Sequence, residues 1–339
     1  MALYLTEQDV GRLLTMEACV EAVEQAFRQW ADGRADNRPR ARATVRGAVL
    51  HALAAGSDVW GRLAAKVYAT TRQGARFVVL LFDGQRSDLL AIIEADRLGQ
   101  TRTGAASGVA TRRLARRDAR SLAVIGTGWQ ARSQAKAIST VRQLERINAF
   151  GRDHDRLLEF CRETEAACGV KVTACASAEE AARGADIIVT ATSSTQPVLR
   201  GAWLSPGAHV NAIGGNRADR RELDGAAIAR AGLIVVDSIE QARLEAGDLL
   251  AADAGAAAGG TAPAGGGAGA PRPGPLDRAV ELKDIVGGAH PGRRSEAEII
   301  LFKSLGIGLE DLAAASLVYD RAIESGAGRQ VPPGGRGAI

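Results

Sequence analysis

Hydrophobic and polar positions follow several different periods along the 339-residue chain. In residues 1–30, apolar side chains recur at helical spacing, and Thr6 and Thr15 stand where helices commonly begin. Residues 40–83 alternate between apolar and polar positions and break at glycines, which predicts several antiparallel strands. A run of small residues at 103–115 predicts a closely packed helix. We therefore expect an α+β region at the start of the chain.

From residue 117 onward, short apolar runs alternate with segments of helical period. Each run is almost wholly apolar, as in parallel strands that are buried on both faces. Strands that alternate with helices predict an α/β fold with a parallel, doubly wound sheet of the Rossmann type. The expected strands are 122–125, 146–150, 171–175, 186–191, 209–213 and 233–236.

Two segments depart from these periods. Residues 254–275 are almost wholly Gly, Ala and Pro, and we expect a disordered loop because such a tract buries no core. Residues 295–322 predict a returning strand and helix, and the Gly/Pro-rich residues 326–339 predict a flexible tail. The expected domains are an α+β domain made of residues 1–116 with 296–325, and a central Rossmann domain of residues 117–295.

A glycine-rich turn follows the first expected strand of the central domain, in the sequence Val-Ile-Gly-Thr-Gly-Trp-Gln-Ala at 124–131. Gly126 permits a tight turn, and Gly128 lets the backbone approach a pyrophosphate. Ala131 keeps the following helix close to the strand, and the helix N-terminus favours phosphate charge. The strand–turn–helix context favours dinucleotide binding over an ordinary glycine turn.

Composition and charge argue against several other classes of protein. No stretch of 18 apolar residues predicts a membrane span, and the N-terminus lacks the pattern of a signal peptide. The net charge of +4 is scattered, and the densest basic patch, at 112–117, fits a solvated helix end better than a nucleic-acid site. The four cysteines form no C-x-x-C pair and have no histidine at metal-ligand spacing, so we expect reduced thiols in a cytoplasmic protein and no metal site.

Two basic residues are candidates for binding an anionic substrate. Arg102 precedes the small-residue helix, where its charge would oppose the helix dipole unless an anion bound there. Lys66 shares a strand face with Tyr68 and Thr70, and it would hold a carboxylate or act as an acid if that face lined a cleft. The alternatives are a surface arginine and a solvated strand lysine.

Two further residues follow expected strands of the Rossmann domain. Arg152 stands where an acidic residue would grip the ribose of NAD, so it favours NADPH, although Asp153 beside it leaves NADH open. Asn216 follows a strand and a glycine pair, which fits either the close approach of a nicotinamide ring or a simple turn. The four histidines are isolated and suggest no catalytic or metal constellation, which leaves hydride transfer from a bound cofactor.

Over about residues 1–325 the chain resembles the ornithine cyclodeaminase/mu-crystallin family. The resemblance rests on four segments, while the Gly/Ala/Pro tract has no counterpart that we can match. It implies a substrate-binding and dimerisation domain, a cofactor-binding Rossmann domain, and a homodimer without nucleic-acid or membrane partners. The segments are residues 92–106, 124–131, 209–216 and 301–312.

The resemblance also implies roles for individual residues. Arg40, Lys66 and Arg102 match the group that binds the substrate carboxylate. The positions that match the surroundings of the dinucleotide, together with Gly126 of the motif above, are Thr103, Gly128, Gln130, Ala131, Arg152, Thr190, Ile213 and Ser304.

Asn216 is the main departure from the family pattern, because cyclodeaminases typically place an aspartate there. A neutral amide can hydrogen-bond an imine or a water, but it cannot exchange a proton. A second departure is Arg220, where cyclodeaminases can carry a lysine. With Lys66 and Asn216 as catalytic residues, and Lys66 or water as the proton source, the chain is expected to reduce small 2-imino acids.

The expected substrates are cyclic ketimines, Δ1-pyrroline-2-carboxylate and Δ1-piperideine-2-carboxylate, and the expected products are L-amino acids. The expected cofactor is NADPH, with NADH as the second choice. The alternatives are an ornithine or lysine cyclodeaminase, an enzyme like alanine dehydrogenase, and an NADPH-dependent ligand-binding protein like mu-crystallin.

Overall fold

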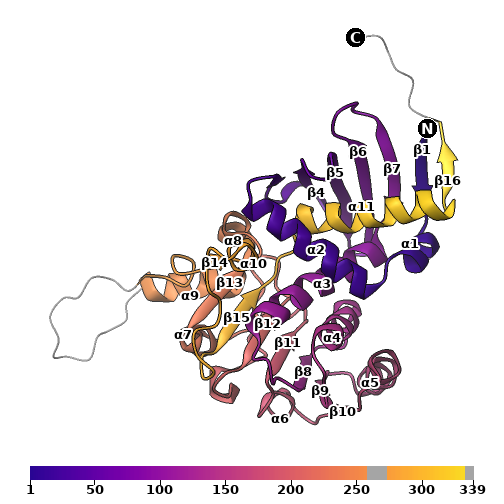
Figure 1. Cartoon of the computed structure of the whole chain (residues 1–339). Coiled ribbons are helices and arrows are strands. Elements are labelled where there is room, and N and C mark those ends of the chain that lie inside the picture. Colours follow the sequence, from indigo (N-terminus) through magenta and orange to yellow (C-terminus); the bar gives the residue numbers. More distant parts are fainter. Residues whose placement is uncertain (258–272, 333–339) are drawn as a thin grey trace. The chain divides into compact units, whose positions relative to one another are not determined.

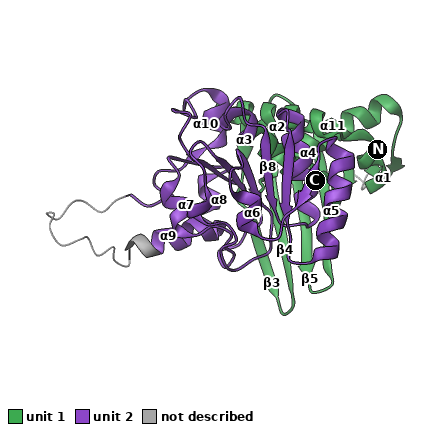
Figure 2. Cartoon of the chain, turned by 90° about the horizontal axis from the view of Figure 1, so that it is seen from below, with its two compact units in different colours: residues 1–109, 306–339 green, residues 110–305 purple. Residues whose placement is uncertain are grey.

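The computed structural model describes residues 1–257 and 273–332 (Figure 1). The chain divides into two compact units (Figure 2). Unit 1 comprises Met1–Val109 and Gly306–Ile339, and unit 2 comprises Ala110–Leu305. The sequence pattern predicts domain boundaries at 116 and 296. No helix of the described residues is long and apolar enough to cross a membrane.

Unit 1 is a mixed sheet with helices packed against it. Thr6 begins its first helix with a complete capping box, and Thr15 caps the second, as the sequence predicts. The helices are α1 (Glu7–Leu13), α2 (Met16–Ala31), α11 (Gly308–Ser325) and most of α3 (Asp96–Leu114). The strands are β1 (Ala2–Leu5), β2 (Ala35–Asn37), β3 (Ala41–Val45), β4 (Ala48–Ser57), β5 (Arg62–Thr71), β6 (Gly74–Asp83), β7 (Leu89–Glu94) and β16 (Arg329–Val331).

The sheet of unit 1 runs in the order β16-β1-β7-β6-β5-β4-β2, and β3 pairs with β4. The strands β4 to β7 form antiparallel neighbours, which confirms the alternating pattern of residues 40–83. Helix α11 lies across one face of this sheet and also packs on α2 (Figure 1). Lys66 and Tyr68 on β5 are buried on the helix-covered face. The alternate residues of β5 lie on the opposite face.

Unit 2 alternates strands with helices, as predicted. Its strands are β8 (Ser121–Ile125), β9 (Arg146–Phe150), β10 (Val172–Ala174), β11 (Ile187–Thr190), β12 (His209–Ala212), β13 (Leu233–Val236), β14 (Val280–Glu281) and β15 (Ile300–Lys303). Its helices are α4 (Trp129–Val141), α5 (His154–Cys168), α6 (Ala178–Ala182), the 3-10 turn η1 (Gly201–Trp203), α7 (Gly225–Arg230), α8 (Ile239–Glu245), α9 (Gly247–Ala257) and α10 (Leu282–Gly287).

The sheet of unit 2 is parallel throughout, in the order β10-β9-β8-β11-β12-β15-β13-β14. Alternate residues of the same strand enter two separate cores, so both faces of the sheet are covered. In β8, Ala123 and Ile125 join one core while Leu122 and Val124 join the other. This is the doubly wound Rossmann-type arrangement, and its strand order reverses between β8 and β11.

The structure corrects three details of the sequence interpretation. The strand of the returning segment, β15, does not lie in unit 1; it pairs with β12 and β13 in the sheet of unit 2. Residues 254–257 of the expected loop complete helix α9, because alanine is the strongest helix former. Part of the expected tail forms β16, which pairs with β1. Residues 258–272 of the loop and 333–339 of the tail lie outside the described residues.

Candidate active site

Three predicted basic residues come together inside unit 1. Arg40 lies between β2 and β3, Lys66 lies on β5, and Arg102 lies in α3, and all three are buried. Arg40 donates to the carbonyl of Gly306 at 2.9 Å, and Gly306 also lies directly beside the guanidinium of Arg102. The charges of Arg40 and Arg102 both act on Lys66. The three residues that we predict to bind a carboxylate therefore form one cluster.

Two carboxylates at the start of α11 hold the cluster. Asp311 Oδ1 accepts from Lys66 Nζ at 3.0 Å and from Arg102 Nε at 2.8 Å. Glu310 Oε2 accepts from a terminal nitrogen of Arg102 at 2.7 Å. Both acidic side chains are 1% exposed, so these ion pairs are shielded from solvent screening. Lys66 and Arg102 are thus paired with buried carboxylates, and Arg40 lies beside them.

Arg102 is not placed where the sequence suggested. Helix α3 begins at Asp96, so Arg102 lies in its second turn rather than before its first. The argument from an opposed helix dipole is therefore wrong, because that effect is confined to the end of a helix. What compensates the charge of Arg102 is the carboxylate pair of Glu310 and Asp311.

Two glycines make room for these cations. A Cβ at Gly99 would lie 2.9 Å from Lys66 Nζ, and a Cβ at Gly306 would lie 2.4 Å from a terminal nitrogen of Arg102. Gly306 also has a φ of +73°, in the left-handed region that side chains rarely adopt. The backbone at both positions therefore has to approach the cations without a side chain between them.

The environment of Lys66 changes its acidity. Burial, followed by the positive charge of Arg102, lowers the pKa of Lys66 to about 8, and the pairing with Asp311 opposes this shift only in part. A lysine with this pKa keeps its proton at neutral pH but releases it far more readily than an exposed lysine. The Lys66 ammonium can therefore bind a carboxylate and also supply a proton.

The glycine motif of unit 2 has the geometry that a dinucleotide needs. Gly126 has a φ of +113°, and a Cβ there would lie 2.4 Å from the carbonyl oxygen of Ala191, in the segment after β11. Gly128 is the N-cap of α4, no side chain of the described residues caps the helix there, and nothing lies within 4 Å of a Cβ built on it. The first N–H groups of α4 can therefore approach a pyrophosphate. Ala131 is buried in the same core as Val124 and keeps α4 against β8.

Arg152 follows β9, and its side chain is exposed. The neighbouring Asp153 is the N-cap of α5, where its carboxylate accepts from the backbone of Arg156 at 3.1 Å. Asp153 is thus engaged in capping α5, whereas the side chain of Arg152 is exposed to solvent. These residues fit a cofactor that carries phosphate groups.

Of the remaining residues predicted to lie near the cofactor, three donate hydroxyl hydrogen bonds within the protein, and two lie at the ends of elements of unit 2. Thr190 and Ser304 are buried, and their hydroxyls donate to Glu222 at 2.9 Å and to Asp237 at 3.4 Å. Thr103 donates to the carbonyl of Gly99 within α3. Gln130 and Ile213 lie at the start of α4 and directly after β12, and Ile213 is buried.

Glu222 is a residue that the sequence interpretation missed. Its carboxylate accepts four hydrogen bonds: from the Thr190 hydroxyl, from both the backbone and hydroxyl of Thr192, and from the backbone of Gly214. The Glu222 carboxylate therefore joins the end of β11 to the loop after β12.

Near Gly215 of the same loop, Lys303 and Asp248 form an ion pair of 3.0 Å in which both side chains are fully buried.

Asn216 lies in that loop, four residues after the end of β12, and is exposed. Arg220 donates to the backbone carbonyl of Ser193. Asn216 belongs to unit 2 and Lys66 to unit 1. The two residues that we predict to be catalytic thus come from different compact units of the chain.

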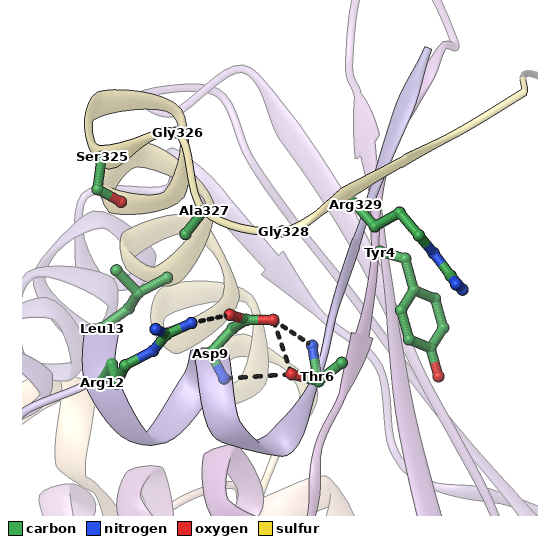
Figure 3. Close-up of a pocket in the computed structure, with 10 residues that line it drawn as sticks. All are labelled: Tyr4, Thr6, Asp9, Arg12, Leu13, Ser325, Gly326, Ala327, Gly328 and Arg329. Carbon is green, nitrogen blue, oxygen red and sulfur yellow. Dashed lines mark hydrogen bonds and ion pairs between the residues drawn. The ribbon is translucent and has the colours of Figure 1, made fainter.

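One cavity of unit 1 contains none of these residues. A space of about 730 Å³ in unit 1 lies between the start of the chain and the end of α11 (Figure 3). Three of the polar side chains drawn there are engaged with one another: Asp9 accepts from Thr6 and from Arg12. This cavity therefore offers no set of groups for chemistry.

Glu310 and Asp311 had a visible signal in the sequence. They are adjacent acidic residues in the otherwise apolar stretch Gly-Leu-Glu-Asp-Leu-Ala-Ala-Ala at 308–315. Charges in the buried face of a helix are rarely tolerated without partners, so this pair could have been assigned to the basic residues.

Comparison with known proteins agrees with this fold. Residues 2–326 match the model of the ornithine cyclodeaminase/mu-crystallin family. Over 257 residues the chain is 37% identical to a Δ1-pyrroline-2-carboxylate reductase of Bacillus cereus, covering 75% of this chain and 73% of that protein.

Two solved structures are similar over nearly the whole chain. A Δ1-pyrroline-2-carboxylate reductase of Thermococcus litoralis, in complex with NADH and L-proline, is 31% identical with a TM-score of 0.89, covering 97% of this chain and 100% of that one. An archaeal alanine dehydrogenase dimer with bound NAD is 29% identical with a TM-score of 0.87, covering 98% and 99%. The chain belongs to the ornithine cyclodeaminase/mu-crystallin family.

Proposed function

We propose that this protein is an NAD(P)H-dependent reductase of small 2-imino acids, with cyclic ketimines such as Δ1-pyrroline-2-carboxylate as its first substrates. The observation that carries the proposal is the buried cluster of Arg40, Lys66 and Arg102, which brings two guanidinium groups and one ammonium group together. Basic groups gathered in this way suit a carboxylate, which accepts charge-assisted hydrogen bonds from guanidinium and ammonium groups. The relatives that reduce Δ1-pyrroline-2-carboxylate support the same reaction.

In this mechanism the cluster binds and orients the imino acid. Arg102 and Arg40 present guanidinium groups, whose planar fork suits a carboxylate. Fixing the carboxylate also fixes the neighbouring imine carbon, and such orientation lowers the barrier of a two-substrate reaction. The cofactor supplies the hydride, and Lys66 or water supplies the proton that the product amine requires. Asn216 would contribute a hydrogen bond rather than a proton.

We propose unit 2 as the cofactor domain and unit 1 as the substrate domain. The crowded Gly126 and the uncapped start of α4 support phosphate binding in unit 2. Arg152 supports NADPH over NADH, because an arginine accommodates the additional 2′-phosphate. Arg152→Asp is the test: the NADPH/NADH ratio of kcat/KM should fall, and an unchanged ratio would remove Arg152 from cofactor selection.

We also propose that the enzyme is a homodimer. On the sheet face opposite α11, apolar residues of β4 and β5 remain exposed, with Leu50 at 47% and Leu63 at 51%. Ala65 pairs with Leu80 and Val67 with Val78 across the same face. An apolar surface of this kind is usually covered by a partner. The dimeric alanine dehydrogenase of similar structure supports a second copy as that partner.

A cytoplasmic location is part of the proposal. Four cysteines are free in the structure, as expected for a reducing compartment.

The substrate is tested by cofactor oxidation against a panel of imino and oxo acids. Fast turnover of a cyclic ketimine is expected, and the preferred ring size follows from the same data. In the reverse direction, L-ornithine or L-lysine with release of ammonia would favour a cyclodeaminase, and L-alanine would favour an alanine dehydrogenase. Tight cofactor binding with no turnover of any compound would favour a ligand-binding protein instead.

A further inference from the structure

One oxygen of Asp311 has no hydrogen-bond donor among the described residues. Asp311 Oδ1 is shared between Lys66 and Arg102, but Asp311 Oδ2 is fully buried and has no hydrogen-bond partner among the described residues. The side chain as a whole is 1% exposed, so solvent does not compensate for the missing bond. A buried carboxylate oxygen without a donor is costly, and such an atom in a binding site commonly meets a donor on the ligand.

The position of this oxygen suits a particular ligand. Both oxygens of Asp311 are bonded to one carbon, so Oδ2 lies beside the same Lys66 and Arg102 that are proposed to hold the substrate carboxylate. In a 2-imino acid the nitrogen and the carboxylate are attached to the same carbon. A group that receives the nitrogen must therefore lie next to the groups that receive the carboxylate, as Asp311 Oδ2 does.

We propose that Asp311 Oδ2 accepts a hydrogen bond from the protonated imine nitrogen of the substrate, an inference that rests on the proposed function. The carboxylate charge then stabilises the iminium form, which is the better hydride acceptor. The imine carbon receives the hydride, and the C=N electron pair passes to nitrogen, which keeps its proton and becomes an amine. A second proton, from the Lys66 ammonium or from water, gives the ammonium group of the amino acid.

This role gives the site a basis for selecting imino acids over oxo acids. A 2-oxo acid has a carbonyl oxygen where the imino acid has an N–H donor. That oxygen would face Asp311 Oδ2 as one acceptor against another, and the buried carboxylate would remain without a donor. Sites built around such a donor–acceptor pair discriminate strongly against ligands that lack the donor. Selection for nitrogen would thus come from Asp311, without a carboxylate at position 216.

Binding of two product-like ligands tests the proposal without turnover. L-Proline carries an ammonium N–H, whereas (S)-tetrahydrofuran-2-carboxylate has a ring oxygen in its place and the same carboxylate. Isothermal titration of the full-length protein with NAD(P)H present, which cannot react with L-proline, should show L-proline bound about tenfold or more tightly, as expected for a hydrogen bond to a charged group. In Asp311→Asn the preference should fall to within about threefold.

Glu310→Gln is the matched control, because Glu310 accepts from Arg102, whereas Asp311 accepts from both Arg102 and Lys66. It should weaken both ligands together and leave their ratio unchanged. Equal affinities in the wild-type protein would overturn the role of Asp311, whether or not Asp311→Asn folds. A wild-type preference that survives in Asp311→Asn would overturn it too. Failure of the wild-type protein to bind either carboxylate would instead count against the proposed function.

Discussion

At the scale of single residues, the acidity of Lys66 decides how the enzyme responds to pH. Its pKa is lowered to about 8, chiefly by burial, so the ammonium form prevails at neutral pH and is lost as the pH rises through 8. Because the proposed carboxylate binding needs the charged form, affinity for an anionic ligand should be constant below this pKa and fall above it.

The first prediction is therefore a pH profile of binding. The inhibition constant of (S)-tetrahydrofuran-2-carboxylate should increase about tenfold per pH unit well above pH 8, since one proton is lost. This ligand has no group that titrates in the range, so the profile reports the protein. In Lys66→Arg, whose guanidinium stays charged, the rise should disappear. A wild-type profile that stays flat to pH 10 would exclude Lys66 from carboxylate binding.

Gly306 gives a second prediction with a close control. Gly306→Ala should cost about 1–2 kcal/mol of stability from the left-handed backbone, and its Cβ should also displace Arg102. Gly326→Ala shares a left-handed φ of +67° but has nothing within 4 Å of its Cβ. Both variants should lower the melting temperature, whereas only Gly306→Ala should raise KM for the ketimine, by about tenfold or more. Equal KM values would show that Arg102 tolerates the displacement.

The basic members of this cluster were predicted from the sequence, but their partners were not. Asp311 lies 245 residues from Lys66 and 209 residues from Arg102 along the chain. Sequence spacing carries no information on contacts of this separation, because they depend on how α11 packs on the sheet. The residue pattern made Lys66 and Arg102 candidates, the resemblance to the family added Arg40, and the structure identified the carboxylates that hold Lys66 and Arg102.

At the scale of elements, the ends of the parallel strands in unit 2 are held by Glu222. Its four hydrogen bonds join the end of β11 to Gly214, in the loop that leads to Asn216. Burial raises the pKa of Glu222, while Lys303 and the Thr192 donors oppose this shift. The Thr190 hydroxyl that we predicted near the cofactor is thus engaged with Glu222.

Glu222→Gln should weaken cofactor binding, since an amide cannot accept from all four donors. We expect the dissociation constant for NADH, measured by fluorescence titration, to rise about tenfold. Asp186→Asn is a matched control, because Asp186 precedes the same strand and accepts four hydrogen bonds at its opposite end. Both variants should lose thermal stability, but only Glu222→Gln should lose affinity for NADH. Equal losses of affinity would mean that Glu222 acts through stability alone.

The regular elements of unit 2 were largely predictable, because each buried strand is a short apolar run between turn signals. The start of α3 was not predictable, because the side chain that caps this helix comes from a distant part of the sequence. Glu7 accepts from the backbone N–H groups of Asp96 and Arg97, 89 and 90 residues away. The acidic Asp96 is a weak local signal on its own, and the helix was expected to begin after Arg102. Strand β15 was detected, but its place between β12 and β13 depends on packing that periodicity does not encode.

At the scale of the whole molecule, the exposed apolar face of the unit 1 sheet predicts self-association. Leu63→Glu should place a charge in the proposed interface and shift the protein toward monomer in sedimentation velocity, because burying an unpaired charge is costly. Leu158→Glu introduces the same charge at a leucine of similar exposure, 49%, on α5 of unit 2. That control should remain dimeric. A monomeric wild-type protein would exclude the dimer outright.

The central claim is that this protein transfers a hydride to the carbon of a C=N bond. The most direct measurement is mass spectrometry of the product formed from Δ1-pyrroline-2-carboxylate with cofactor deuterated at C4 of the nicotinamide. The account predicts L-proline with deuterium at C2, and no labelled product from Arg102→Ala at the same substrate concentration. Absence of labelled proline, under conditions in which the wild-type protein binds the cofactor, would contradict it.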